Sequence, residues 1–88
     1  MKKVTMFIIQ SCPYCKEAMR LMDALYAENP SYKSLDIQII DENQHPEISD
    51  QYNYSYVPAY YIEEEKLHEG AASLDKIRRV FDAAMERQ

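Results

Sequence analysis

In Cys12-Pro13-Tyr14-Cys15, two cysteines stand three positions apart at the junction between a predicted strand and a predicted helix. Residues 4–9 before them form a short, nearly continuous apolar run with β-branched members, which is typical of a strand buried on both faces. Residues 14–28 after them place apolar side chains at helical spacing, which predicts an amphipathic helix that ends at Asn29-Pro30. Residues 35–40 then alternate apolar and polar side chains, so a second strand completes a right-handed β-α-β unit.

The second half of the chain adds a short helix, a hairpin and a last helix. Residues 45–52 read as a short helix with Pro46 in its first turn. An aromatic, β-rich segment and a polar return segment predict an antiparallel hairpin, with strands at 59–62 and 66–69 and an acidic turn at 63–65. Gly70 ends the hairpin, and Ser73 can cap a helix that continues to the C-terminus. The order β-α-β-α-β-β-α predicts an α/β fold with a four-stranded mixed sheet and helices on both faces.

Length and composition are those of one small domain. Eighty-eight residues suffice for one hydrophobic core, and 47% of them are hydrophobic, so we expect residues 1–88 to form a single domain. A net charge of −5 argues against nucleic acid or an anionic membrane as the main partner. No apolar run approaches the ~20 residues of a membrane span, and the start of the chain lacks the features of a signal peptide. We therefore expect a cytoplasmic monomer.

The cysteine pair favours chemistry over structural stapling, because a crosslink across so short a loop constrains the unfolded chain little. Cys12 stands at the N-cap of the predicted helix and Pro13 at its first position, so unpaired N–H groups and the helix dipole favour a Cys12 thiolate. Cys15 follows one helical turn later, within reach of a disulfide. We predict that Cys12 is the nucleophile and Cys15 the resolving thiol of a thiol–disulfide exchange. Tyr14 either offers an aromatic surface to a substrate or is simply exposed.

A Cys-x-x-Cys pair is also half of a zinc site. His45 and His68 would have to complete a Cys₂His₂ set, but their positions lack the spacing of a zinc finger. We expect both histidines to be surface or turn residues and expect no metal site.

The chain resembles the glutaredoxin and small thioredoxin-like family over nearly its whole length. The resemblance rests on Cys12-Pro13-Tyr14-Cys15 after the first strand, on Tyr56-Val57-Pro58 before a later strand, and on Gly70 before the last helix. It implies a thioredoxin fold in which the bond before Pro58 is cis and Pro58 lies beside the cysteines. It also implies that Val57 offers its backbone to a bound peptide as an added strand, and that substrate binding involves Pro13, Tyr14, Tyr56, Val57, Pro58 and Gly70.

The sequence departs from the family where glutaredoxins bind glutathione. They usually carry a basic residue three positions before the first cysteine, and here Ile9 stands there. Residues 51–56 contain no basic residue, and of the family's second binding segment only Gly70 matches cleanly, with Ser73 and Asp75 as weak candidates. The catalytic centre is therefore better supported than a glutathione site.

The resemblance implies an enzyme that reduces protein disulfides or glutathione-mixed disulfides, with no bound cofactor and with glutathione as a possible co-substrate. One alternative is a thioredoxin-like carrier whose electron donor is a thioredoxin reductase. A second alternative, from another class, is a binding module in which two copies share an iron–sulfur cluster or a zinc ion through Cys12.

Two further patterns concern packing. Tyr52, Tyr54 and Tyr56 alternate with polar residues just before Val57-Pro58. They form either an aromatic rim for a protein substrate or the filling of a helix-to-strand connection. Met19 and Met22 are interpreted as core residues.

Overall fold

The computed structural model describes residues 3–87, and its strands and helices follow the predicted order. The strands are β1 (Lys3–Ile8), β2 (Asp36–Asp41), β3 (Ala59–Ile62) and β4 (Glu65–Glu69). The helices are α1 (Pro13–Glu28), α2 (Pro46–Ser49) and α3 (Leu74–Glu86), with a 3₁₀ helix, η1 (Pro30–Ser34), after α1. One four-stranded sheet has the order β2-β1-β3-β4, in which β1 and β2 are parallel and the other pairs antiparallel. The predicted mixed sheet is confirmed.

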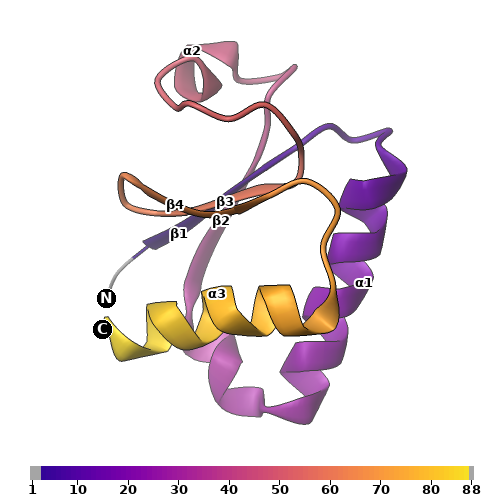
Figure 1. Ribbon diagram of the computed structural model, residues 1–88, viewed down its shortest axis with the longest axis vertical. Coiled ribbons are helices and arrows are strands. Elements are labelled where there is room, and N and C mark those ends of the chain that lie inside the picture. Colours follow the sequence, from indigo (N-terminus) through magenta and orange to yellow (C-terminus); the bar gives the residue numbers. More distant parts are fainter. Residues whose placement is uncertain (1–2, 88) are drawn as a thin grey trace.

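Helices cover both faces of the sheet (Figure 1). α1 and α3 lie together on one face, and α2 lies on the other. The β1–α1 junction and the segment between α2 and β3 lie at the same end of the molecule. The radius of gyration is 12.1 Å, which matches the value of about 12 Å expected for a compact domain of this length. No helix within residues 3–87 is long and apolar enough to cross a membrane.

The alternation of side chains along the central strands divides the core into two layers. Val4 and Met6 of β1 pack in one cluster with Tyr60 and Ile62 of β3, against the apolar stripes of α1 and α3. These stripes consist of Ala18, Met22 and Leu25 in α1 and Ile77, Val80, Phe81 and Ala84 in α3. Because successive strand residues face opposite sides, β1 is buried on both faces, as its apolar run predicted. Each fully buried large side chain contributes about 1.5–3 kcal/mol, so this layer supplies much of the stability.

The second layer is aromatic and contains two of the three alternating tyrosines. The ring of Phe7 lies 4.8 Å from that of Tyr52 and stacks on that of Tyr54 at 4.9 Å. Tyr61 completes the cluster, with its ring edge toward Phe7. Tyr56 alone of the three is exposed, at 68%. Tyr52 and Tyr54 therefore fill the connection between α2 and β3, and the idea of an aromatic rim holds at most for Tyr56.

Several predicted boundaries and one predicted core residue are corrected. β1 and β2 are displaced by one residue from the predicted 4–9 and 35–40, α2 ends at Ser49 instead of residue 52, and β4 begins at Glu65. The 3₁₀ helix η1 was not predicted from the sequence; it follows α1 and is capped by the Asn29 side chain, whose oxygen accepts a hydrogen bond from the Ser31 N–H at 3.2 Å. Met19 is 37% exposed and not a core residue, because it lies one position beyond the buried Ala18 and so points about 100° away from the stripe.

Candidate active site

Cys12 is held at the point where β1 passes into α1. It is the N-cap of α1, with an extended backbone, and Pro13 is the first helical residue. Its N–H donates to the Ile9 carbonyl at 2.9 Å, and its carbonyl accepts from the N–H groups of Cys15 and Lys16, both at 3.1 Å. These bonds fix the backbone of Cys12 and leave its thiol partly exposed. The predicted placement of Cys12 at the N-cap is confirmed.

The thiol of Cys12 lies in an environment that favours its charged form. The backbone N–H of Cys15 points at the sulfur and is the main cause of the lowered pKa of Cys12. Burial opposes this effect, and the N–H of Tyr14 and the thiol of Cys15 add to it, so the pKa remains lowered. These donors belong to the first turn of α1, whose N–H groups have no partner within the helix. The direction is the one expected from the sequence.

Cys15 lies behind Cys12 and differs from it in both exposure and the direction of its pKa shift. Its side chain faces the core and is only 3% exposed. Burial, together with the negative charges of Cys12 and Asp41, raises the pKa of Cys15 to about 11. Both cysteines are free thiols. The structure therefore pairs a partly exposed thiol whose pKa is lowered with a buried thiol that is protonated at neutral pH.

Asp41 is a residue of this site that the sequence did not single out. It closes β2, and its Oδ2 accepts a hydrogen bond from the Gln10 N–H at 3.2 Å. Its Oδ1 accepts from the Asn43 N–H at 2.8 Å. Asp41 thus joins β2 to the loop that carries Cys12, and its charge acts on Cys15. The signal in the sequence was its position: the carboxyl ends of two parallel strands, β1 and β2, meet at one edge of the sheet.

The segment Tyr56-Val57-Pro58 leads into β3. The Val57–Pro58 peptide bond is cis, as the family resemblance implied. Pro58 is buried, and its carbonyl accepts a hydrogen bond from the Gly70 N–H at 2.9 Å. Gly70 has φ +89, a conformation that favours glycine, and a Cβ added there would lie 3.6 Å from the Cβ of Tyr56. Gly70 therefore lies directly against the Tyr56-Val57-Pro58 segment.

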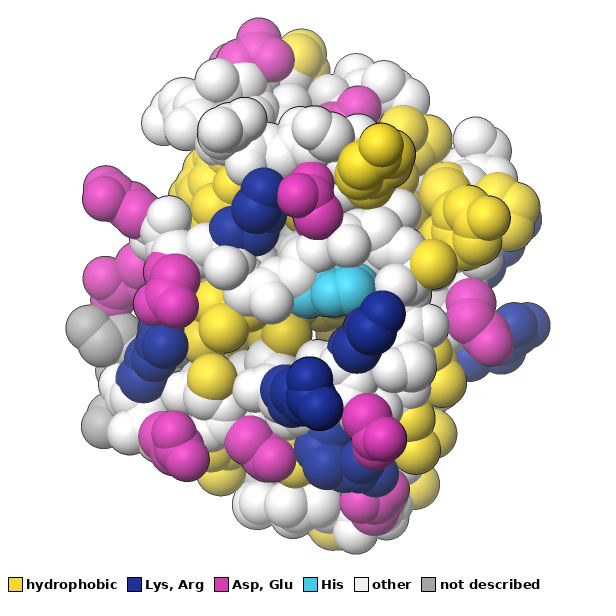
Figure 2. Space-filling model, viewed as in Figure 1, with side chains coloured by type: hydrophobic (Ala, Val, Ile, Leu, Met, Phe, Trp, Pro, Cys, Tyr) yellow, Lys and Arg dark blue, Asp and Glu magenta, His cyan; other side chains and the backbone are white. Residues whose placement is uncertain are grey.

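The surface at this end of the molecule is apolar in places and mixed in charge elsewhere. Tyr14 and Tyr56 are the most exposed large hydrophobic side chains within residues 3–87, at 61% and 68%. Figure 2 shows hydrophobic side chains gathered where α1 begins, and acidic and basic side chains interspersed over the rest of this face. A shallow hollow of about 500 Å³ adjoins the loop before Cys12 and is lined by Ile9, Gln10, Ser11, Lys16, Asp41, Asn43 and Gln44. Lys16 is the one cation in that lining.

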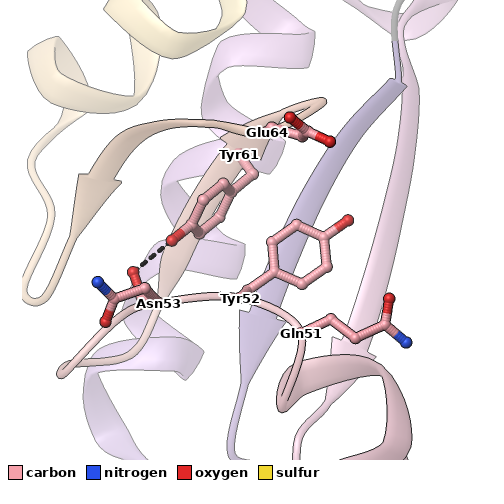
Figure 3. A pocket seen from close by; sticks show the side chains of 5 residues that line it. All are labelled: Gln51, Tyr52, Asn53, Tyr61 and Glu64. Atoms are coloured by element: carbon pink, nitrogen blue, oxygen red, sulfur yellow. Dashed lines mark hydrogen bonds between the residues drawn. The ribbon is translucent and has the colours of Figure 1, made fainter.

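A second hollow, of about 370 Å³, is lined by Gln51, Tyr52, Asn53, Tyr61 and Glu64 and by neither cysteine (Figure 3). The hydroxyl of Tyr61 points toward the backbone of Asn53 and donates a hydrogen bond to its carbonyl. This hollow borders the α2–β3 loop.

The histidines stay apart from the cysteines. His45 is the N-cap of α2 and lies 3.3 Å from Glu47, and His68 in β4 lies 3.0 Å from the Gly70 carbonyl. In the described part of the chain, no three side chains of the His, Cys, Asp and Glu types come close enough together to hold a metal ion. A Cys₂His₂ set is therefore not formed within one chain.

Comparison with known proteins shows which family and which solved structures this chain resembles. A family model described as a thioredoxin domain matches residues 2–82. Similar solved structures include oxidised thioredoxin from Plasmodium falciparum (TM-score 0.70, 13% identity, covering 93% of this chain and 79% of that one). Thioredoxin from Fasciola hepatica has a TM-score of 0.68 and 20% identity, covering 94% of this chain and 80% of that one. Oxidised thioredoxin O1 from Arabidopsis thaliana has a TM-score of 0.68 and 16% identity, with 96% and 78% covered.

At these identities the structures show the fold alone, and the predicted thioredoxin fold is confirmed. No curated protein matches the chain.

Proposed function

Because the chain belongs to the thioredoxin-domain family and brings two thiols together at the start of α1, we propose that it is an enzyme that reduces protein disulfides by dithiol exchange. The observation that carries the proposal is the contrast between the thiols. Cys12 is partly exposed with a lowered pKa, and Cys15 is buried with a pKa raised to about 11. A nucleophile must be ionised and accessible, whereas a resolving thiol must wait until the first bond has formed.

The reaction transfers two electrons from the protein to the substrate. The Cys12 thiolate attacks one sulfur of the substrate disulfide, that bond breaks, and the leaving substrate thiolate takes up a proton. Cys15 then loses its proton and attacks the Cys12 sulfur, which releases the second substrate thiolate and leaves a Cys12–Cys15 disulfide. Conversion of Cys12 from a thiolate to a neutral disulfide partner removes one of the negative charges that hold the Cys15 proton. A reductant then restores both thiols, and no bound cofactor is required.

The proposed substrate is an extended stretch of protein lying across the cysteines. The backbone N–H and carbonyl of Val57 form no hydrogen bond within residues 3–87, so they are available to an added strand. In this proposal the exposed rings of Tyr14 and Tyr56 flank the bound strand. Pro13 and Gly70 are proposed to complete the binding surface, and Gly70 lies directly against Tyr56.

The proposed electron donor is a thioredoxin reductase. No basic side chain occurs in residues 9–11 or 51–56, where a glutathione carboxylate would need one. Glutathione is the second candidate, because Cys12-Pro13-Tyr14-Cys15 is the tetrapeptide that glutaredoxins typically use, and Lys16 lines the hollow beside it. Reduction of the oxidised protein by glutathione and by a thioredoxin reductase system, measured side by side, distinguishes the two.

Replacement of each cysteine tests the assignment of roles. We expect Cys12→Ser to abolish reduction of a protein disulfide, and Cys15→Ser to accumulate a covalent complex with the substrate that mass spectrometry detects. On a glutathionylated substrate, retained turnover by Cys15→Ser supports glutathione as co-substrate, and equal loss from both replacements rules out the glutaredoxin assignment. A Cys12→Ser variant with normal activity would refute the enzyme proposal.

The purified state of the protein tests the binding-module alternative. We expect a colourless monomer that loses two titratable thiols on oxidation. A coloured dimer whose thiols are blocked would instead favour a cluster shared through Cys12.

A further inference from the structure

The loop between α2 and β3 is held by a carboxylate from β4. Oε1 of Glu69 accepts hydrogen bonds from the backbone N–H groups of Ser55, at 2.8 Å, and Tyr56, at 3.3 Å. The other oxygen, Oε2, lies 2.7 Å from Nζ of Lys66. One carboxylate thus fixes two successive backbone groups, and a cation holds the carboxylate.

The start of the same loop is fixed by two side chains of the β3–β4 hairpin. The carbonyl of Asn53 accepts a hydrogen bond from the Tyr61 hydroxyl, which Figure 3 shows pointing toward it. Nζ of Lys66 lies 3.4 Å from the same carbonyl. Because Lys66 contacts both the Asn53 carbonyl and Glu69, it connects the two places where the hairpin holds the loop.

The contact between Glu69 and the loop matters because the loop leads directly into Val57-Pro58. Glu69 holds the N–H of Tyr56, and its neighbour Gly70 donates to the carbonyl of Pro58 at 2.9 Å. Val57 lies between these two attachment points, and its own N–H and carbonyl have no partner within residues 3–87. An incoming strand binds well only when such backbone groups already lie in the bound geometry, because ordering them at the moment of binding costs free energy.

Starting from the proposed function, we infer that Glu69 is a positioning residue, which sets the backbone at Tyr56 and Val57 for an extended protein substrate. The side chain of Glu69 is 27% exposed, so its hydrogen bonds are partly shielded from water and stronger than those of a fully exposed residue. The inference separates two kinds of substrate. A protein disulfide uses the Val57 backbone, whereas a small disulfide needs only the Cys12 sulfur.

The test compares Glu69→Ala, Glu69→Gln and a matched control, Glu64→Ala, which removes one acidic residue from the hairpin turn. Each protein is assayed with insulin as the protein disulfide and with dithiobis(nitrobenzoate) as the small one. We expect Glu69→Ala to raise KM for insulin about tenfold, the scale of one lost hydrogen bond to a charged group, with no change for the small disulfide. Glu69→Gln keeps an oxygen that can accept from Ser55 and Tyr56, so its KM for insulin stays within about twofold of the wild type. Glu64→Ala leaves both values unchanged.

Equal KM values for insulin in Glu69→Ala and the wild type would overturn the inference, and so would a parallel loss on both substrates. A second measurement does not depend on the folding of Glu69→Ala. In the wild type, the amide protons of Ser55 and Tyr56 should shift together as Glu69 titrates, with a pKa below the usual range because Lys66 and these N–H groups stabilise the carboxylate. In Glu69→Gln neither should move.

If the Ser55 and Tyr56 amide resonances of the wild type do not shift as Glu69 titrates, their hydrogen bonds to Glu69 are absent and the inference is overturned. Failure of the proposed function is a different result, namely that the wild type reduces neither disulfide. The two failures are therefore distinguishable.

Discussion

Two side chains of identical composition differ in chemistry here because of where their sulfurs lie. The Cys12 sulfur faces the first-turn N–H groups of α1, and the Cys15 sulfur faces the core and a nearby Asp41. A shift of one pKa unit corresponds to about 1.4 kcal/mol between the two protonation states, so a few local contacts are enough to give the two thiols opposite pKa shifts.

The pH dependence of alkylation tests the state of Cys12. In Cys15→Ser, iodoacetamide should react with Cys12 at a rate that follows the thiolate fraction. Half of the maximal rate should be reached at a lower pH than for free cysteine, because the residue-15 and Tyr14 N–H groups lower the pKa of Cys12. The Cys12→Ser variant provides the blank. A midpoint at or above that of free cysteine would contradict the assignment of Cys12 as nucleophile.

Replacement of Asp41 by asparagine tests the electrostatic control of Cys15. Burial is the main cause of the raised pKa of Cys15, and the negative charge of Asp41 is the smallest contribution to it. Asp41→Asn removes that charge, so this pKa should fall slightly while burial keeps it above its ordinary value. The titration is followed by thiolate absorbance in a Cys12→Ser background, where Cys15 is the only cysteine. Asp36→Asn, at the opposite end of β2, is the matched control and should have no effect. An unchanged Cys15 pKa in Asp41→Asn would mean that burial alone raises it.

The N-cap position of Cys12 and the direction of its pKa shift were predictable at this scale, because the groups that act on Cys12 lie within three residues of it in the sequence. Asp41 and Glu69 were not predictable. Asp41 contacts Gln10 across 31 positions, and Glu69 contacts Ser55 and Tyr56 across 14 and 13. A single sequence does not show that these carboxylates lie close to backbone N–H groups so far away along the chain.

Among the elements, α3 shows how a short local pattern determines where a helix begins. Ser73 was predicted as its cap, and Oγ of Ser73 accepts a hydrogen bond from the Lys76 N–H at 3.2 Å. The apolar stripe that follows was predictable from its spacing, and it is buried as expected. The burial of Tyr32 in the 3₁₀ helix η1 was not predictable, because its hydroxyl donates a hydrogen bond to Asp82, which is 50 residues away in the sequence.

Removal of the α3 cap tests this element. Ser73→Ala should lower the free energy of unfolding by about 1 kcal/mol, because the Lys76 N–H loses its acceptor. Ser73→Thr retains the hydroxyl and should lose much less. Urea denaturation measures both variants. An alanine variant as stable as the wild type would show that water replaces the cap without cost.

For the whole molecule, the buried thiol couples folding to alkaline pH. A group whose pKa is higher in the folded state stabilises the fold fully below its unfolded pKa, and this contribution is lost as pH rises through the folded pKa. For Cys15 the loss should therefore run from about pH 9 to about pH 11. The same direction holds for Tyr54 and Tyr60, whose pKa values burial raises.

Urea denaturation at several pH values isolates the part of this alkaline loss of stability that is due to Cys15. In a Cys12→Ser background, the free energy of unfolding should fall more steeply above pH 9 with Cys15 present than after Cys15→Ala. Tyr54 contributes equally to both proteins and cancels in the difference. The Cys15 charge also helps to raise the pKa of Tyr60, so this coupling is counted in the part due to Cys15. Parallel pH profiles would contradict a raised Cys15 pKa.

The edge strand β4 affects whether the protein can self-associate through its sheet. Its pairing with β3 shifts register between Tyr60 and Tyr61, and it presents Glu65, Lys66 and Glu69 along its length. An uneven, charged border is a poor template for a neighbouring chain, since another backbone cannot dock on it ladder-fashion without desolvating those ions. Another copy of the chain therefore cannot easily pair with β4 even at high protein concentration, and fibrous self-association through this edge is disfavoured.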